Sequence, residues 1–240
     1  MINYAHRGAS EYAPENTLSS FYLGLFCGAN GIETDVQKTK DGVLVLFHDD
    51  TVDRVTNGSG RVSDFTLEEL QNLTVFSTDR KYTDRIVTFE EFLQKFGWRD
   101  LQFAIELKQP EIERETIALL EQYRMLEKTI LTSFTYENLV RAKQCDSRYR
   151  VGWLYSVGNE QTVEKMRAIG GEQLCPRANQ LTREQIEAYH ALGFSVRAWG
   201  VANEELMRRM VDDGADGMTV NFPDRLTAYW TEKAGGEGKE

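Results

Sequence analysis

The sequence predicts an α/β protein, a single (β/α)8 (TIM) barrel with a small insertion after its second strand. Short apolar segments typical of strands alternate with segments of helical periodicity along almost the whole chain. Eight such pairs fit into the 240 residues, at about 30 residues for each pair. A doubly wound open sheet is the alternative, but the turn after the first strand, His6-Arg7-Gly8-Ala9, lacks the Gly-rich phosphate motif expected there.

The first segments establish this alternation. A strand is predicted at Ile2–Ala5, and a helix begins at Pro14-Glu15-Asn16-Thr17 and continues to Gly28. The second strand covers residues 32–37, where branched apolar residues alternate with acidic and polar ones. Residues 49–85 are irregular and too numerous for an ordinary loop, so we predict that they form the insertion, packed over one end of the domain.

The other six strand and helix pairs follow in order. Capping boxes with flanking apolar residues predict helix starts at Thr66, Thr88 and Thr182. Strands are expected at residues 101–108, 129–133, 150–154, 173–175, 194–199 and 216–220, and helices at 111–123, 135–145, 159–169, 182–192, 203–213 and 223–231. We therefore expect one barrel domain over residues 1–233 and a disordered tail of Gly, Lys and Glu over residues 234–240.

Composition narrows the possible partners and location. The formal net charge of −10 argues against nucleic acid and anionic membrane surfaces, because both are bound through concentrated positive charge. The three cysteines are scattered and lack metal-ligand spacing, which fits reduced thiols in the cytoplasm. The chain shows no signal peptide and no apolar run near the ~18 residues of a membrane span. We expect a cytoplasmic protein with a small-molecule ligand and no membrane anchor.

Two acidic residues on the second strand are the first candidates for a functional site. Alternation places Glu33 and Asp35 on one face of this strand, opposite the branched residues. Two close carboxylates stay ionised only beside a cation or several donors, so a hard divalent cation such as Mg²⁺ or Ca²⁺ explains them best. His48 ends the next apolar run, Val43–Phe47, and is a candidate general acid or base. On these residues alone, a solvated acidic edge strand is an equally good interpretation.

The barrel prediction brings further polar residues to this site, because the active sites of such barrels lie at the carboxyl ends of the strands. Glu106 and Lys108 share one face of the third strand, at its end. Glu33, Asp35 and Glu106 are therefore expected to converge as three oxygen ligands of a six-coordinate cation. Arg7 and Lys108 would add positive charge, so a phosphate group is the natural guest.

Short motifs recur in order along the chain. They are His6-Arg7-Gly8, Pro14-Glu15-Asn16-Thr17, Glu33-Thr34-Asp35-Val36, Asp41-Gly42, His48-Asp49 through Arg54 and Thr56 to Gly60, and Glu106-Leu107-Lys108. Weaker ones follow at Trp199, Ala215-Asp216-Gly217 and Phe222-Pro223-Asp224. This ordered set, which spans essentially the whole chain, resembles that of the glycerophosphodiester phosphodiesterases.

The resemblance implies a metal-dependent phosphoric diester hydrolase on a (β/α)8 barrel. Such an enzyme cleaves glycerophosphodiesters to glycerol 3-phosphate and an alcohol, a step of lipid and glycerol metabolism. The matched positions imply one divalent cation, Mg²⁺ or Ca²⁺, at Glu33, Asp35 and Glu106, a catalytic pair at His6 and His48, and phosphate contacts from Arg7 and Lys108. Trp199 ends a strand, where the wall of a substrate pocket is favoured over core filling.

Two departures from the family pattern bear on substrate preference. Gly200 stands where a Thr often follows the tryptophan, and Asn221 stands where an Asp commonly precedes Phe-Pro. A lysophospholipase D or sphingomyelinase D-like activity on lipid phosphodiesters is the alternative enzyme, and a catalytically silent barrel that only binds ligands is the alternative from another class. Either water or the substrate's own glycerol hydroxyl could be the first nucleophile.

Three other polar residues have structural interpretations. His190 is expected at the surface of a helix, and Arg197 is interpreted as a buried ion-pair partner inside the barrel. Asp49 is expected to orient a histidine or to hold its loop.

Overall fold

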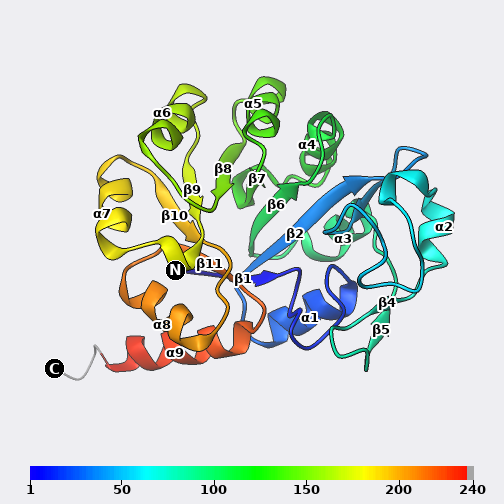
Figure 1. Cartoon of the computed structure of the whole chain (residues 1–240), viewed down its shortest axis with the longest axis horizontal. Coiled ribbons are helices and arrows are strands. Elements are labelled where there is room, and N and C mark those ends of the chain that lie inside the picture. Colours follow the sequence, from blue (N-terminus) through cyan, green and yellow to red (C-terminus); the bar gives the residue numbers. More distant parts are fainter. Residues whose placement is uncertain (237–240) are drawn as a thin grey trace.

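Eight parallel strands close into a barrel because the first strand pairs with both the second and the last. The computed structural model describes the chain over residues 1–236 and its side chains over residues 1–233. Around the barrel the order is β1 (Ile2–His6), β2 (Gly31–Lys38), β6 (Gln102–Leu107), β7 (Thr129–Ser133), β8 (Arg150–Tyr155), β9 (Gln173–Pro176), β10 (Ser195–Ala198) and β11 (Gly217–Val220). The pairs β1–β11 and β1–β2 close the ring (Figure 1), which confirms the (β/α)8 prediction and excludes an open sheet.

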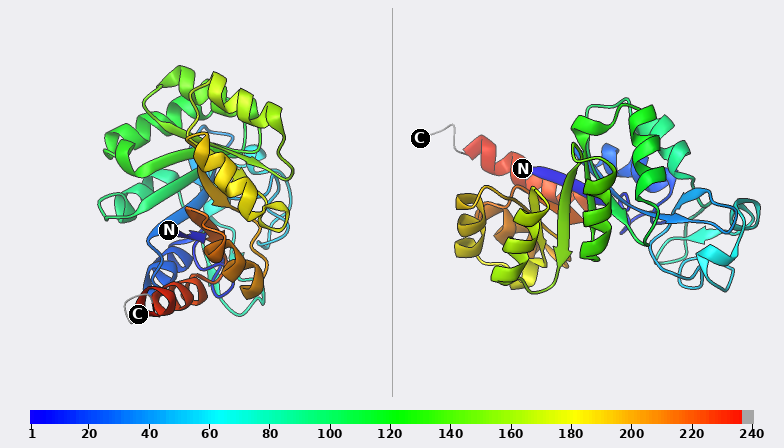
Figure 2. Two further views of the ribbon diagram at one scale, coloured as in Figure 1. Left: turned by 90° about the vertical axis from the view of Figure 1, so that its left-hand side faces the viewer. Right: turned by 90° about the horizontal axis from the view of Figure 1, so that it is seen from above.

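Helices surround the strands on the outside of the barrel, as Figures 1 and 2 show. They are α1 (Leu18–Phe26), α3 (Phe89–Phe96), α4 (Glu113–Gln122), α5 (Tyr136–Cys145), α6 (Glu160–Ala168), α7 (Arg183–Ala191), α8 (Glu204–Asp212) and α9 (Pro223–Gly236). Thr66 and Thr182 make both hydrogen bonds of the predicted capping boxes, whereas Thr88 makes only the bond to the backbone NH of Glu91. Apolar residues of the strands and helices together form the main core.

The segment between β2 and α3 (Figure 2) begins with a hairpin and includes residues 49–85, where the insertion was predicted. It contains β3 (Leu44–Leu46), the 3₁₀ turn η1 (Val62–Asp64), α2 (Leu67–Gln71), β4 (Val75–Phe76) and β5 (Thr83–Asp84). β3 runs antiparallel to β2 outside the barrel. The insertion has a small apolar core of its own, which includes Val52, Val62 and Leu70. The hairpin returns the chain to the carboxyl end of β2, and His48 follows there.

The first and the last helix, α1 and α9, differ from the prediction at one end each. α1 begins at Leu18, after the N-cap Thr17, and not at Pro14, because Asn16 adopts a φ of 56° that a helix does not allow. α9 continues to Gly236, so residues 234–236 are helical rather than disordered, and residues 237–240 of the predicted tail lie outside the described part of the chain. Within residues 1–236, no helix combines the length and apolar character needed to cross a bilayer.

Candidate active site

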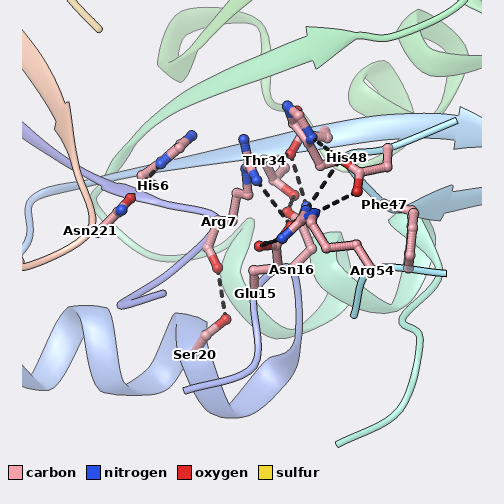
Figure 3. A network of polar contacts seen from close by, with 12 residues as sticks. His6, Arg7, Glu15, Asn16, Ser20, Thr34, Phe47, His48, Arg54 and Asn221 are labelled. Atoms are coloured by element: carbon pink, nitrogen blue, oxygen red, sulfur yellow. Dashed lines mark hydrogen bonds and ion pairs between the residues drawn. The ribbon is translucent and has the colours of Figure 1, made fainter. Parts of the chain in front are cut away.

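The turn after β1 places the first functional residues, and it depends on Gly8. Arg7 and Gly8 have φ values of 55° and 84°, which turn the chain sharply at the end of the strand. A Cβ at Gly8 would lie 2.4 Å from the backbone carbon of Ser20 at the start of α1. This close approach lets the Ser20 hydroxyl donate a hydrogen bond of 2.8 Å to the Arg7 carbonyl oxygen (Figure 3).

Gly8→Ala should therefore lower the free energy of unfolding for two reasons, the contact with Ser20 and the positive φ of the backbone. The positive φ alone costs about 1–2 kcal/mol for an L-residue, so the total loss should be larger than that. Gly42→Ala is the matched control, because Gly42 has a φ of 85° and its Cβ would meet nothing within 4 Å. Urea unfolding of the two variants measures the difference. Equal losses of stability would show that the contact between Gly8 and Ser20 contributes nothing.

Three carboxylates come together on the neighbouring strands β2 and β6. Glu33 and Asp35 lie on β2, and Asp35 is in register with Glu106 of β6. One oxygen of each lies within 4.8 Å of the others, and all three side chains are buried. Asp35 Oδ1 has no hydrogen-bond partner among the described residues. The cluster predicted from strand alternation is therefore present as one group of oxygen atoms.

The three carboxyl groups differ in their electrostatics. Burial, with the nearby Asp35 and Glu106, raises the pKa of Glu33 to about 8. Burial and Asp35 also raise the pKa of Glu106. Burial alone would raise the pKa of Asp35, but Arg7 and Lys108 hold it well below its usual value. Without a cation, the cluster therefore retains a proton at neutral pH.

Two cations lie against this cluster. Arg7 Nε is 3.3 Å from Asp35 Oδ2, and its Nη1 is 2.9 Å from Glu15 Oε1. Lys108 Nζ is 2.8 Å from Glu106 Oε1 and 3.7 Å from Asp35 Oδ1. Both cations thus lie beside the acids, as the sequence predicted. Of the two, Arg7 also lines a cavity next to the cluster, whereas Lys108 does not.

His6 ends β1, and its ring lies between Asn221 and Glu33. Its Nδ1 lies 2.5 Å from Asn221 Oδ1, and its Nε2 lies 3.9 Å from Glu33 Oε2. Burial and the charge of Arg7 lower the pKa of His6 to about 3, so the ring is neutral at physiological pH. Asn221 is one of the departures from the family pattern, and the structure shows that it is the partner of His6.

His48 is held by a chain of ion pairs, of which sequence reasoning predicted the contact with Asp49 but not those of Arg54 and Glu15. Its Nδ1 is 2.6 Å from Asp49 Oδ1, and Asp49 Oδ2 accepts a bond of 2.6 Å from Arg54 Nε. Arg54 also donates two bonds, of 2.9 and 2.7 Å, to Glu15, which accepts from Arg7 as well. Asp49 therefore does both things proposed for it. Figure 3 shows His6 and His48 on either side of Arg7 in this view.

A cavity of about 180 Å³ lies at the centre of these groups. Its lining residues are His6, Arg7, Glu33, His48, Glu106, Phe134, Leu154, Arg197, Trp199, Gly200 and Thr219. Trp199 is therefore a pocket wall, as predicted. Arg197 is buried, but it bonds the neutral Gln173 and Thr219 rather than forming the predicted ion pair. His190 is exposed and pairs with Asp216, away from the cavity.

Comparison with known proteins identifies the family. The family model described as "Glycerophosphoryl diester phosphodiesterase family" matches residues 6–225. The chain belongs to this family. It is 36% identical over 229 residues to the glycerophosphodiester phosphodiesterase of Caldanaerobacter subterraneus subsp. tengcongensis, covering 92% of this chain and 94% of that protein. A Bacillus subtilis glycerophosphodiester phosphodiesterase is 31% identical, with 93% and 84% of the two chains covered.

Solved structures agree with this assignment. A phosphodiesterase of Oleispira antarctica in complex with sn-glycerol-3-phosphate has a TM-score of 0.83 and 27% identity, over 95% of this chain and 96% of that one. A glycerophosphodiester phosphodiesterase of Thermotoga maritima has a TM-score of 0.78 and 26% identity, over 95% and 98%. The chain is thus a phosphoric diester hydrolase of the glycerophosphodiester phosphodiesterase family, and the resemblance seen in its motifs is confirmed.

Proposed function

We propose that the reaction is metal-dependent, with Glu33, Asp35 and Glu106 as ligands of one divalent cation, Mg²⁺ or Ca²⁺. The donor set supports this, because three buried carboxylates provide hard oxygen ligands and Asp35 Oδ1 has no hydrogen-bond partner among the described residues. The cation would act as a Lewis acid on the phosphate oxygens. Lys108 would neutralise part of the excess negative charge of the site, through its contacts with Glu106 and Asp35.

Arg7 is the proposed phosphate clamp. Its side chain lines the cavity beside His6, Glu33 and His48, and it is the lining cation nearest to the acidic cluster through its contact with Asp35. A guanidinium group presents several donors to phosphate oxygens. Glu15 accepts a bond from its Nη1 and so fixes its orientation before substrate binds. Lys108 adds positive charge beside the phosphate, and Trp199 forms the apolar wall of the pocket.

His6 and His48 are the proposed acid and base. One takes the proton of the attacking hydroxyl group, and the other gives a proton to the leaving alkoxide, so the two steps balance. Both histidines line the cavity, and each Nδ1 is fixed by a partner, Asn221 for His6 and Asp49 for His48. The opposite nitrogen, Nε2, is thereby left for proton transfer.

Loss of either histidine should remove most of the rate. His6→Ala and His48→Ala should each lower kcat/KM by about 10²–10⁴-fold and each remove one limb of a bell-shaped pH profile. His190→Ala is the matched control, because this exposed histidine pairs with Asp216 outside the site. A variant of His6 or His48 with the parent's kcat would assign that residue a structural role only.

Hydrolysis itself tests the proposed function. Purified protein with glycerophosphoethanolamine and added Mg²⁺ or Ca²⁺ should release glycerol 3-phosphate and ethanolamine, detected by phosphorus NMR. We also propose a cytoplasmic enzyme of lipid and glycerol metabolism, in keeping with its three free cysteines, Cys27, Cys145 and Cys175. Absence of glycerol 3-phosphate with either cation would contradict the proposed substrate class.

A further inference from the structure

The cavity has a polar half and an apolar half. The polar half comes from β1, β2, β6 and the hairpin, and it contains His6, Arg7, Glu33, His48 and Glu106. The apolar half comes from the carboxyl ends of β7, β8 and β10, and it contains Phe134, Leu154, Trp199 and Gly200. Arg197 and Thr219 also line the cavity, where the Arg197 guanidinium donates to the Thr219 hydroxyl at 2.7 Å. The Phe134 and Trp199 rings meet edge to face, with centroids 4.9 Å apart. Among the described side chains, no carboxylate lines this apolar half.

These halves separate the two arms of a substrate, provided that the proposed function holds. The hydroxyl groups of the glycerol arm need polar partners, and proton transfer requires them near the histidines. Trp199 Nε1 already donates to the carbonyl oxygen of Tyr155 at 3.0 Å, so its ring offers the cavity only apolar surface. The alcohol that leaves, called here the head group, is therefore directed over Phe134 and Trp199.

An exposed charged side chain, that of Arg177, flanks this apolar half at Trp199. The guanidinium carbon of Arg177 lies 5.6 Å from the centroid of the Trp199 ring. The side chain also passes close to Gly200, where a Cβ would lie 3.4 Å from Arg177 Cγ. Arg177 follows β9 directly and is exposed. Its guanidinium has no hydrogen bond or ion pair with any side chain among the described residues, unlike those of Arg7 and Arg54.

We propose that Arg177 selects the head group, favouring glycerophosphodiesters whose leaving alcohol carries an anionic group over those whose leaving alcohol is only cationic. An aromatic wall would otherwise suit an ammonium group through cation–π contact. Here the arginine guanidinium already lies against the tryptophan and would repel a second cation. A carboxylate on the head group would instead gain an ion pair with Arg177. This inference rests on the proposed function and names its preferred substrates.

A matched pair of substrates tests the inference. Glycerophosphoserine and glycerophosphoethanolamine share the same ammonium group and differ by one carboxylate. The ratio of their kcat/KM values should favour serine by about two- to fivefold, the size expected for one exposed ion pair. Arg177→Gln should bring the ratio close to one, and Arg177→Glu should invert it. Because both rates come from the same preparation, partial misfolding of a variant cancels from the ratio.

The control separates local charge from net charge. Arg167→Glu makes the same charge change on α6, at an exposed arginine that does not line the cavity. Its ratio should equal the parent's, and the parent's ratio should fall with added salt. An unchanged ratio in Arg177→Glu, with both substrates hydrolysed, would overturn the inference alone. If the parent protein hydrolyses neither substrate, the proposed function is overturned and this inference with it.

Discussion

Treatment with EDTA should abolish hydrolysis, and addition of one divalent cation, Mg²⁺ or Ca²⁺, should restore it. The reason is electrostatic, because three buried carboxylates would otherwise repel the phosphate that Arg7 must bind. Glu106→Gln should impair the restoration by removing one charged ligand. The melting temperature should also rise with added cation in the parent protein, because a ligand that binds only the native state stabilises it. Full activity in thoroughly chelated protein would contradict the ligand assignment.

The same prediction has a pH dependence that follows from Glu33. The pKa of this carboxyl group is raised to about 8 without a cation, so it holds a proton at neutral pH. A cation must displace that proton. The apparent affinity for the cation should therefore increase about tenfold for each unit by which the pH rises toward about 8, and it should level off at higher pH. Calorimetry in two buffers of different ionisation enthalpy measures the released proton. Glu115→Gln is a suitable control, because Glu115 is exposed and pairs with Lys38.

The acidic cluster was predictable because its geometry follows from local rules. Alternation along one strand places Glu33 and Asp35 on one face, and parallel pairing of β2 with β6 puts Asp35 beside Glu106. The closed barrel then brings the ends of all strands to the same side. Residues at these strand ends, such as His6 and Trp199, could therefore be placed near one another from sequence alone.

The supporting contacts were not predictable in this way, because they join segments that no periodicity relates. Arg54 lies in the irregular insertion, and its bonds to Glu15 cross 39 residues of sequence. Asn221 meets His6 only because the last strand closes on the first, 215 residues away. The local prediction for α1 failed for a similar reason: Asn16, before the helix, takes a left-handed conformation and donates to Asp35.

A substrate analogue that lacks the 2-hydroxyl group of glycerol should bind but not turn over. We propose that this hydroxyl, adjacent to the phosphate ester, attacks phosphorus first, while one histidine takes its proton and the other protonates the leaving alcohol. The product of this step is a cyclic glycerol phosphate, which water opens with the histidine roles reversed. A tethered nucleophile avoids the entropic cost that free water incurs, and effective molarities of such groups reach about 10⁵ M or more. Requirement for glycerol then has a chemical reason.

Two analogues make the test specific. A phosphodiester of 1,3-propanediol lacks the attacking hydroxyl and should lose nearly all of kcat while it still inhibits competitively. A phosphodiester of 1,2-propanediol keeps that hydroxyl and lacks only the terminal one, so it should still turn over and should give a cyclic phosphate visible by phosphorus NMR. If water attacks phosphorus directly, the 2-hydroxyl group is not the nucleophile. Both analogues should then turn over, and neither should give a cyclic phosphate. Turnover of the 1,3-propanediol analogue near the parent rate, without any cyclic phosphate, would refute the two-step route, yet the family assignment would stand because it rests on the matched chain and fold.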